Sequence, residues 1–281
     1  MILVFGKTGQ VASVLKNHKN ITLLGRDVVD LSSPKKCRDI ILSYSPKAVI
    51  NAAAFTDVDK AESQEVLATK INGEAPLIMA NACKEMDIPL VHISTDYVFD
   101  GSGKLPWRPE DKTAPQTAYG RSKLIGEEAV SSTNANHAII RTSWIFSAMR
   151  KNFLKTILFM SKKKTLINIV DDQIGGPTYA YDIAYVCLNA AIKLQKDKNK
   201  SGIYHFSGTP DVSWANFAKE ILNQVGSKTK VNAIPSCNYN SSVKRPLNSR
   251  LDCRSLEEVF GFKRSNWKLG IKKVLKYLEI V

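Results

Sequence analysis

Short apolar runs alternate along the first part of the chain with longer stretches whose apolar residues recur at helical spacing. This pattern predicts strands at 1–5, 21–24, 47–54, 88–94 and 138–144. It predicts helices at 11–17, 61–86 (with a break near Gly73 and Pro76), 119–131 and 152–162. Alternation of strands and helices is typical of a parallel sheet with helices on both faces. The fold class is therefore α/β, a Rossmann-like, doubly wound parallel sheet.

The regularity falls after about residue 165. Amphipathic helices are expected at 213–225 and 267–279, with an irregular stretch rich in Asn, Ser and Pro at 235–250 between them. No internal repeat and no clean linker separates the two parts of the sequence. We therefore expect residues 1–165 to build the sheet, and 166–281 to form mainly a smaller C-terminal portion that is interleaved with it across an approximate boundary.

Composition and charge narrow the class of protein. Of the 281 residues, 44% are hydrophobic and 23% are charged, as in ordinary globular proteins. The net charge of +14 favours an anionic partner, which is either nucleic acid or a small phosphorylated ligand. No run of 18 apolar residues predicts a membrane span, and the first residues form an apolar strand and not a basic leader. Five scattered cysteines without a CxxC motif indicate reduced thiols, so we expect a cytoplasmic protein without a metal site.

A glycine-containing turn connects the first strand to the first helix. It consists of Gly6, Lys7, Thr8, Gly9, Gln10 and Val11, followed by Ala12. Such a turn directs backbone N–H groups and a helix N-terminus at a pyrophosphate, with Gly6 permitting the turn and Gly9 letting the phosphates approach. The alternative is an ordinary strand–helix turn that needs glycine for positive φ. The GK[ST] of a P-loop is missing, so nucleoside triphosphate hydrolysis is not expected.

The end of the second strand carries the residues that select between dinucleotides. Arg26 can pair with a 2′-phosphate, whereas the neighbouring Asp27 suits the free ribose hydroxyls of NAD. Asp30 and Leu31 are expected at the adenine edge. The predicted cofactor is NADPH, with NADH possible, and residues 1–165 are expected to bind it.

A tyrosine, a lysine and a threonine form the candidate catalytic group. Tyr119 and Lys123 are four residues apart and share one face of a predicted helix, while Thr95 ends the strand before it. A nearby ammonium stabilises a phenolate and is expected to move the pKa of the tyrosine toward neutrality. The same lysine can hold the nicotinamide ribose, so Tyr119 and Lys123 are also expected at the cofactor. A threonine hydroxyl can hydrogen-bond a carbonyl oxygen that becomes an alkoxide. The alternative is a surface tyrosine with a solvated lysine.

Six segments together give a specific resemblance. They are Gly6–Val11, Asn51–Glu62, Ser94–Phe99, Tyr119–Lys123, Arg141–Trp144 and Arg245–Leu251, in this order. The chain resembles the dTDP-4-dehydrorhamnose reductases, a family of the extended short-chain dehydrogenase/reductase superfamily, over nearly its whole length. The resemblance implies reduction of the 4-keto group of dTDP-4-dehydro-β-L-rhamnose to dTDP-β-L-rhamnose with NAD(P)H, a step that serves cell-surface polysaccharide synthesis.

The resemblance also assigns roles to individual residues. It implies Tyr119 as the proton donor, Lys123 as its electrostatic partner and Thr95 beside the carbonyl. It implies cofactor contacts for Ala53, Ala54, Phe55 and Thr56, and substrate contacts for Thr56, Val58, Thr95, Asp96 and Trp144. From the residues alone, Trp144 could equally belong to the core. Asn248 and Arg250 fit a diphosphate, which a guanidinium grips with two hydrogen bonds, or else a polar loop.

Three further features concern the oligomeric state, a possible cation site and a segment without an assigned role. Some members of this family hold a magnesium-bridged dimer with a glutamate in the first helix, and the matching Val14 cannot ligate a metal, so a monomer or a weak homodimer is expected. Asp57, Asp59 and Glu62 are explained by the preference of acids for a helix N-terminus, so no cation site is expected there. The Asp-Gln-containing segment 171–178 also matches the family, without a chemistry that we can assign.

Four other functions are compatible with parts of the sequence. A dehydratase or epimerase is disfavoured because the acid–base pair of a dehydratase is missing after Thr95. A reductase of another nucleotide-linked 4-keto-6-deoxy sugar stays open, as does a non-catalytic NADP-binding regulatory subunit. A nucleic-acid binder is supported only by the net charge, so no nucleic-acid partner and no membrane association are expected.

Overall fold

A six-stranded parallel sheet forms the centre of the protein in a computed structural model, which describes residues 1–280. Its strands are β1 (Ile2–Phe5), β2 (Ile21–Leu24), β3 (Ala48–Asn51), β4 (Leu90–Thr95), β5 (His137–Thr142) and β10 (Gly202–His205). They are ordered β10-β5-β4-β3-β1-β2, and every pair is parallel. The predicted doubly wound sheet is confirmed. Because the chain winds outward in both directions from β1 and β3, a ligand crevice is expected at the carboxyl ends of these two strands.

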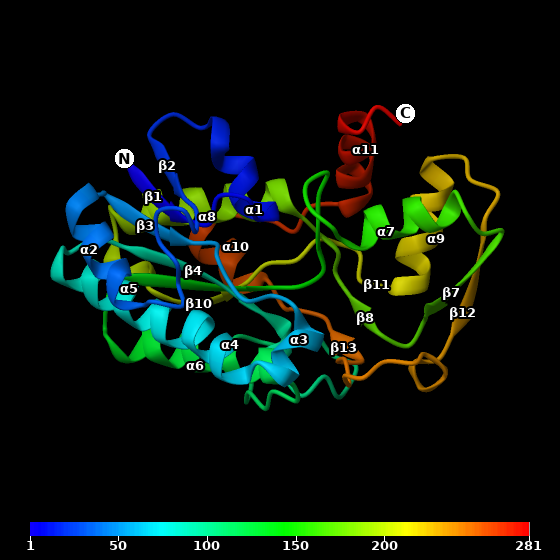
Figure 1. The fold of residues 1–281 in the computed structure, drawn as a ribbon, viewed down its shortest axis with the longest axis horizontal. Helices are drawn as coiled ribbons and strands as arrows, with labels where there is room; N and C mark the ends of the chain where they lie inside the picture. Colours follow the sequence, from blue (N-terminus) through cyan, green and yellow to red (C-terminus); the bar gives the residue numbers. More distant parts are fainter. Residues whose placement is uncertain (281) are drawn as a thin grey trace.

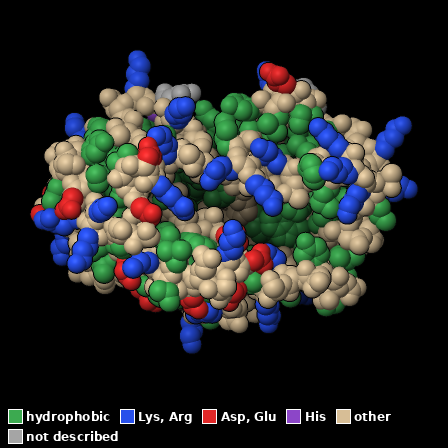
Figure 2. All heavy atoms as spheres, in the orientation of Figure 1, with side chains coloured by type: hydrophobic (Ala, Val, Ile, Leu, Met, Phe, Trp, Pro, Cys, Tyr) green, Lys and Arg blue, Asp and Glu red, His purple; other side chains and the backbone are tan. Residues whose placement is uncertain are grey.

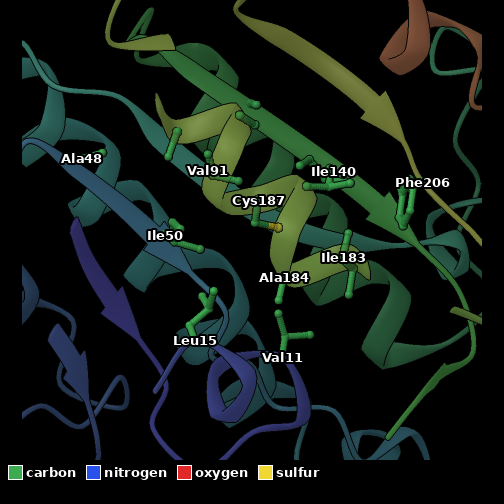
Figure 3. Packing of buried hydrophobic residues seen from close by; sticks show 14 of the residues in the cluster. Val11, Leu15, Ala48, Ile50, Val91, Ile140, Ile183, Ala184, Cys187 and Phe206 are labelled. Atoms are coloured by element: carbon green, nitrogen blue, oxygen red, sulfur yellow. The ribbon is translucent and has the colours of Figure 1, made fainter. Parts of the chain in front are cut away.

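Helices cover both faces of the sheet (Figure 1). On one face lie α1 (Gln10–Val14), α8 (Ala180–Leu194) and α10 (Arg254–Phe260), and on the other lie α2 (Lys35–Tyr44), α5 (Ala75–Glu85) and α6 (Ala118–Ser132). Each face of the sheet has its own apolar core, the first beneath α8 and the second beneath α5. Alternate side chains of β1 belong to these two cores, Val4 to the first and Phe5 to the second. Figure 3 shows Ala184 and Cys187 of α8 against the residues of the first core. Burial on both faces explains why these strands are apolar throughout.

A second lobe has its own apolar core beside the sheet (Figure 1). It contains α7 (Phe153–Ser161), α9 (Trp214–Gln224), α11 (Trp267–Tyr277) and the parallel pair β7 (Leu166–Val170) and β12 (Lys230–Ile234). Short strands connect the lobes: β6 (Ile145–Phe146) with β9 (Thr178–Tyr179), and β8 (Ile174–Gly175) with β11 (Val212–Ser213) and β13 (Asn248–Ser249). The chain passes between the lobes several times, because α7 belongs to the second core whereas α8 and β10 complete the sheet. Among residues 1–280, no helix is long and apolar enough to cross a membrane.

The predicted helix 61–86 is divided into several pieces. It consists of α3 (Val58–Ser63), α4 (Glu65–Thr69), a π-helical turn (Lys70–Glu74) and α5. The π turn lies at the break predicted near Gly73. Within it, the Asn72 carboxamide donates to the carbonyl oxygen of Phe55 at 3.0 Å and accepts from its N–H at 2.8 Å. The widened turn therefore clasps the segment that follows β3, and such turns are frequent at functional sites.

A buried ion pair fixes α6 on the sheet. Arg141 of β5 and Glu127 of α6 lie 2.6 Å apart, and their side chains are 3% and 2% exposed. Arg141 also donates to the Pro109 carbonyl at 3.0 Å, which ties the loop 100–117 to the same point. A paired buried charge contributes little net stability, but removal of one partner leaves the other uncompensated.

We predict that Glu127→Gln lowers the free energy of unfolding by about 3–5 kcal/mol, because Arg141 then stays charged and buried without a counterion. Glu85→Gln is the matched control, since Glu85 pairs with Arg38 on the surface where the two side chains are 50% and 47% exposed. Its cost should be no more than about 1 kcal/mol. Urea denaturation measures both values, and equal losses would contradict this account.

Candidate active site

A cleft of about 1380 Å³ runs between the carboxyl edge of the sheet and the second lobe. Figure 2 shows the hollow near the middle of the molecule, with lysine and arginine side chains around it. Most of the predicted site residues line it: Gly6, Lys7, Thr8, Gly9, Gln10, Val11, Arg26, Asp30, Leu31, Ala53, Ala54, Thr56, Val58, Thr95, Asp96, Tyr119, Lys123 and Trp144. The structure therefore brings the predicted cofactor and catalytic residues into one cleft.

The glycine turn at the end of β1 has the geometry of a dinucleotide loop. Gly6 has φ of +108°, and a Cβ there would lie 3.3 Å from the backbone of Ala52, so only glycine fits. A Cβ at Gly9 would meet only the Ala52 oxygen at 3.8 Å, so the missing side chain leaves room at the backbone for a phosphate. The residues present thus fit the pyrophosphate of a dinucleotide. Gln10 accepts hydrogen bonds from Ser147 and Asn152, and it holds the loop against the second lobe.

Charged residues gather at the end of β2. Lys7 lies 3.1 Å from the Asp27 carboxylate, and its hydrogen bond lowers the pKa of Asp27. The Asp27 carboxylate that would favour a free ribose stays ionised and is paired with Lys7 at the surface. Arg26 lines the same end of the cleft, where its guanidinium fits a 2′-phosphate.

Thr95 and Tyr119 meet where β4 ends and α6 begins. Thr117 caps α6 by accepting from the N–H of Gly120 at 3.0 Å, which fixes the first turn that carries Tyr119. Burial raises the pKa of Tyr119 to about 12, and a hydrogen bond with Thr95 acts in the opposite direction. The pKa of Tyr119 thus lies above its ordinary value and not, as the sequence predicts, nearer to neutrality, because the effect of burial outweighs the hydrogen bond with Thr95. The phenol is therefore protonated at neutral pH and suits a proton donor.

Lys123 lies one turn further along α6 and is 1% exposed. Its Nζ donates to the Ile93 carbonyl oxygen at 2.7 Å and lies 3.1 Å from His92 Nε2. Burial lowers the pKa of Lys123 to about 8. The ammonium form is therefore present below about pH 8 and is lost as the pH rises through that value.

Two buried polar atoms close this end of the cleft. Asp96 is 2% exposed, and burial raises its pKa to about 6 against hydrogen bonds with Ser249 and Thr95. In the described part of the chain, neither Asp96 Oδ2 nor Ser94 Oγ has a hydrogen-bond partner. Buried polar atoms without partners are costly, so this end of the cleft suits a ligand that carries hydroxyl groups.

Two tryptophans form an aromatic surface in the cleft. The predicted strand 138–144 ends at Thr142, and Trp144 has φ of +50°. Its indole stacks on Trp214 with ring centroids 3.6 Å apart, and a Cβ at Gly175 would lie 2.9 Å from it. Trp214 was not predicted, although a tryptophan next to the N-cap Ser213 marks the start of an amphipathic helix. A flat aromatic surface of this kind suits a sugar ring or a base.

The second lobe adds cationic residues that the sequence analysis missed. Arg150, Lys151 and Lys155 line the cleft at the start of α7. The sequence could have indicated this part of the site, because three cationic residues surround Asn152, which caps α7. Their charge suits a diphosphate.

Three of the predicted residues do not line the cleft. The backbone of Phe55 is held by Asn72, as described above. Asn248 is buried and donates to the Ser102 and Leu105 carbonyl oxygens, while Arg250 donates to Asn248 Oδ1 at 3.0 Å. In the structure these two residues hold the loop 100–117, and their contact with a diphosphate stays a prediction.

The acidic residues after β3 have individual roles. Asp57 caps α3, Asp59 pairs with Arg245, and Glu62 accepts from the N–H of Ala118. Within residues 1–280, no three His, Cys, Asp or Glu side chains are grouped as a metal site.

The segment after β7, to which no chemistry was assigned, has a structural role. Asp171 accepts from the Ser213 hydroxyl, Asp172 accepts from the N–H and hydroxyl of Ser236, and Gln173 donates to the same hydroxyl. These bonds join the segment to the start of α9 and the end of β12.

Comparison with known proteins gives the family of the chain. The family model described as RmlD substrate binding domain matches residues 1–280. A dTDP-4-dehydrorhamnose reductase of Sinorhizobium fredii is 38% identical, over 98% of this chain and 96% of its own. The crystal structure of a dTDP-4-dehydrorhamnose reductase from Clostridium acetobutylicum is similar with a TM-score of 0.90 and 35% identity, covering 99% of each chain. The crystal structure of a dTDP-4-dehydrorhamnose reductase from Bacillus anthracis in complex with NADP is similar with a TM-score of 0.90 and 29% identity, covering 98% of each chain. The chain therefore belongs to the dTDP-4-dehydrorhamnose reductase family, as the order of its motifs predicts.

Proposed function

We propose that this protein reduces the 4-keto group of dTDP-4-dehydro-β-L-rhamnose to the hydroxyl of dTDP-β-L-rhamnose with NADPH as the preferred cofactor. The observation that carries the proposal is the meeting of Thr95, Tyr119 and Lys123 in the same cleft as the glycine turn. Relatives at 34–38% identity over nearly the whole chain carry the name of this reductase. The chain is thus an oxidoreductase of the short-chain dehydrogenase/reductase type.

The side chains divide the work of the reaction. A bound nicotinamide supplies a hydride to the sugar C4. The Tyr119 phenol delivers a proton to the keto oxygen as negative charge grows there, and the Thr95 hydroxyl donates a hydrogen bond to the same oxygen. The Lys123 ammonium lowers the cost of the phenolate that remains.

The substrate is held mainly by groups outside the catalytic three. We assign the sugar to the surface of Trp144 and to Asp96, and the diphosphate to Arg150 and Lys155. These four residues precede residue 166, so in this proposal residues 1–165 bind NAD(P) and also contact the substrate. The predicted substrate portion, 166–281, adds Trp214 to the cleft and completes the second lobe.

We further propose that the protein acts in the cytoplasm as a monomer or weak homodimer, without nucleic acid. The free thiols support the cytoplasmic location, because four of the five cysteines are buried and none is paired in the described chain. Val14 supports a monomer or weak homodimer, because its side chain has no atom that could ligate a bridging metal.

Tyr119→Phe should lower kcat by about 10²–10⁴-fold, because the phenol is the general acid. The Kd for NADPH, followed by nicotinamide fluorescence, should rise far less than kcat falls, because the glycine turn and Arg26 hold the phosphates of the cofactor. Tyr185→Phe is the matched control, since Tyr185 is an exposed tyrosine on α8 and should keep full activity. Full turnover in Tyr119→Phe would remove the proposed proton donor.

Arg26→Ala should raise the KM for NADPH by about 10–100-fold, which corresponds to loss of one charge-assisted hydrogen bond to the 2′-phosphate. The KM for NADH and the kcat with either cofactor should stay within about twofold. Arg38→Ala, which removes a surface arginine of α2 from outside the cleft, is the control. Equal effects of Arg26→Ala on the two cofactors would place the 2′-phosphate elsewhere.

A further inference from the structure

His92 is a fully buried histidine beneath the cleft that the reaction described above does not use. It lies on β4 between two polar side chains: its Nδ1 is 3.0 Å from Asn51 Nδ2 on β3, and its Nε2 is 3.1 Å from Lys123 Nζ on α6. The three residues form a short chain of contacts that leads from the sheet to the catalytic lysine. A buried polar chain of this kind has to satisfy its donors and acceptors internally.

The hydrogen-bond partners fix the tautomer of His92. The N–H of Ala53 donates to Asn51 Oδ1 at 3.2 Å, so the amide nitrogen of Asn51 is the atom that faces the histidine. An amide NH₂ is only a donor, and His92 Nδ1 must therefore accept. Burial, followed by the charge of Lys123, holds the pKa of His92 well below its usual range, so the ring is neutral. A neutral ring with a lone pair on Nδ1 carries its proton on Nε2.

This tautomer directs an N–H group at Lys123. An ammonium group has three donors and no acceptor, whereas a neutral amine has a lone pair. The contact at Nε2 is therefore a hydrogen bond when Lys123 is neutral and a contact between two donors when it is charged. Donation from Nζ to the Ile93 carbonyl is available in both forms.

The other titratable groups around Asn51, His92 and Lys123 do not reverse the preference of His92 for the neutral amine of Lys123. Glu127, one turn along α6, favours the ammonium of Lys123, but it is ion-paired to Arg141. Tyr119 and Asp96 lie toward the cleft, and His137 on β5 faces His92, where it disfavours a charged ring. His92 is therefore the group in direct contact with Nζ whose interaction differs between the ammonium and the neutral amine of Lys123.

We propose that His92, oriented by Asn51, is a positioning residue that favours the neutral amine of Lys123 and thereby sets the pH above which Tyr119 loses its cationic neighbour. This inference rests on the proposed function only for the role of Tyr119. The hydrogen-bonding of Lys123 is a property of the folded chain itself.

The test is a pH titration of the Lys123 side chain by NMR in the full-length protein labelled at lysine Cε, with Lys123→Met to assign the signal. The wild type should titrate near pH 8. In His92→Gln the midpoint should rise by about one pH unit, because the glutamine oxygen can accept from the ammonium. His137→Gln is the matched control, since it changes a neighbouring buried histidine without contact to Nζ, and its midpoint should not rise. The basic limb of the kcat/KM profile should move with the Lys123 midpoint, which a purely structural loss would not produce.

An unchanged Lys123 midpoint in folded His92→Gln would overturn the proposal. If that variant does not fold, ¹⁵N shifts of His92 in the wild-type protein give the answer instead: protonation at Nε2 across pH 6–9 is expected, and protonation at Nδ1 would overturn the proposal. Absence of turnover with the dTDP-sugar would contradict the proposed function alone, because both NMR measurements are made without substrate.

Discussion

The site depends on the burial of charge beneath α6. Lys123, Glu127 and Arg141 are each almost fully covered between this helix and the sheet, and a buried charge is tolerated only where its partners are in place. The pairing of Glu127 with Arg141 and the hydrogen bond from Lys123 to the Ile93 carbonyl oxygen therefore fix both the rotation and the height of α6 over the sheet. That placement brings the first turn of the helix, with Tyr119, to the end of β4 beside Thr95.

The second lobe completes the cleft because the chain is interleaved. Gln10 holds the glycine turn to the segment before α7, so the loop that suits the dinucleotide is joined to the lobe that supplies Trp214 and the cationic rim. Asn248 and Trp107 hold the loop 100–117 along the other side, with the Trp107 indole donating to the Asn248 carbonyl. The electrostatics follow from this arrangement: cations line the entrance to the cleft, whereas its inner end holds a phenol and a carboxyl whose pKa values are raised by burial.

The local parts of the site could be predicted from the sequence, and the parts made by distant segments could not. The glycine turn, the helical spacing of Tyr119 and Lys123, and the strand end at Thr95 are encoded within a few residues each. Trp214 reaches the cleft only through packing of the second lobe on Trp144. The helix α8 was missed because its exposed face also carries large apolar residues, Tyr181, Tyr185 and Ile192. The helical spacing of the residues that it buries therefore does not stand out in the sequence. The contacts of Asn248 with the loop 100–117 could not be predicted, because a buried amide that holds a loop looks the same in a sequence as one that faces a cleft.

The central claim is that this cleft brings a nicotinamide and a sugar ketone together beside Tyr119. Its most direct test is the reduction of dTDP-4-dehydro-β-L-rhamnose with NADPH deuterated at the nicotinamide C4, followed by NMR of the product. The account predicts dTDP-β-L-rhamnose with deuterium on C4 of the sugar. Consumption of the keto sugar without deuterium at C4, or deuterium at another carbon, would contradict it.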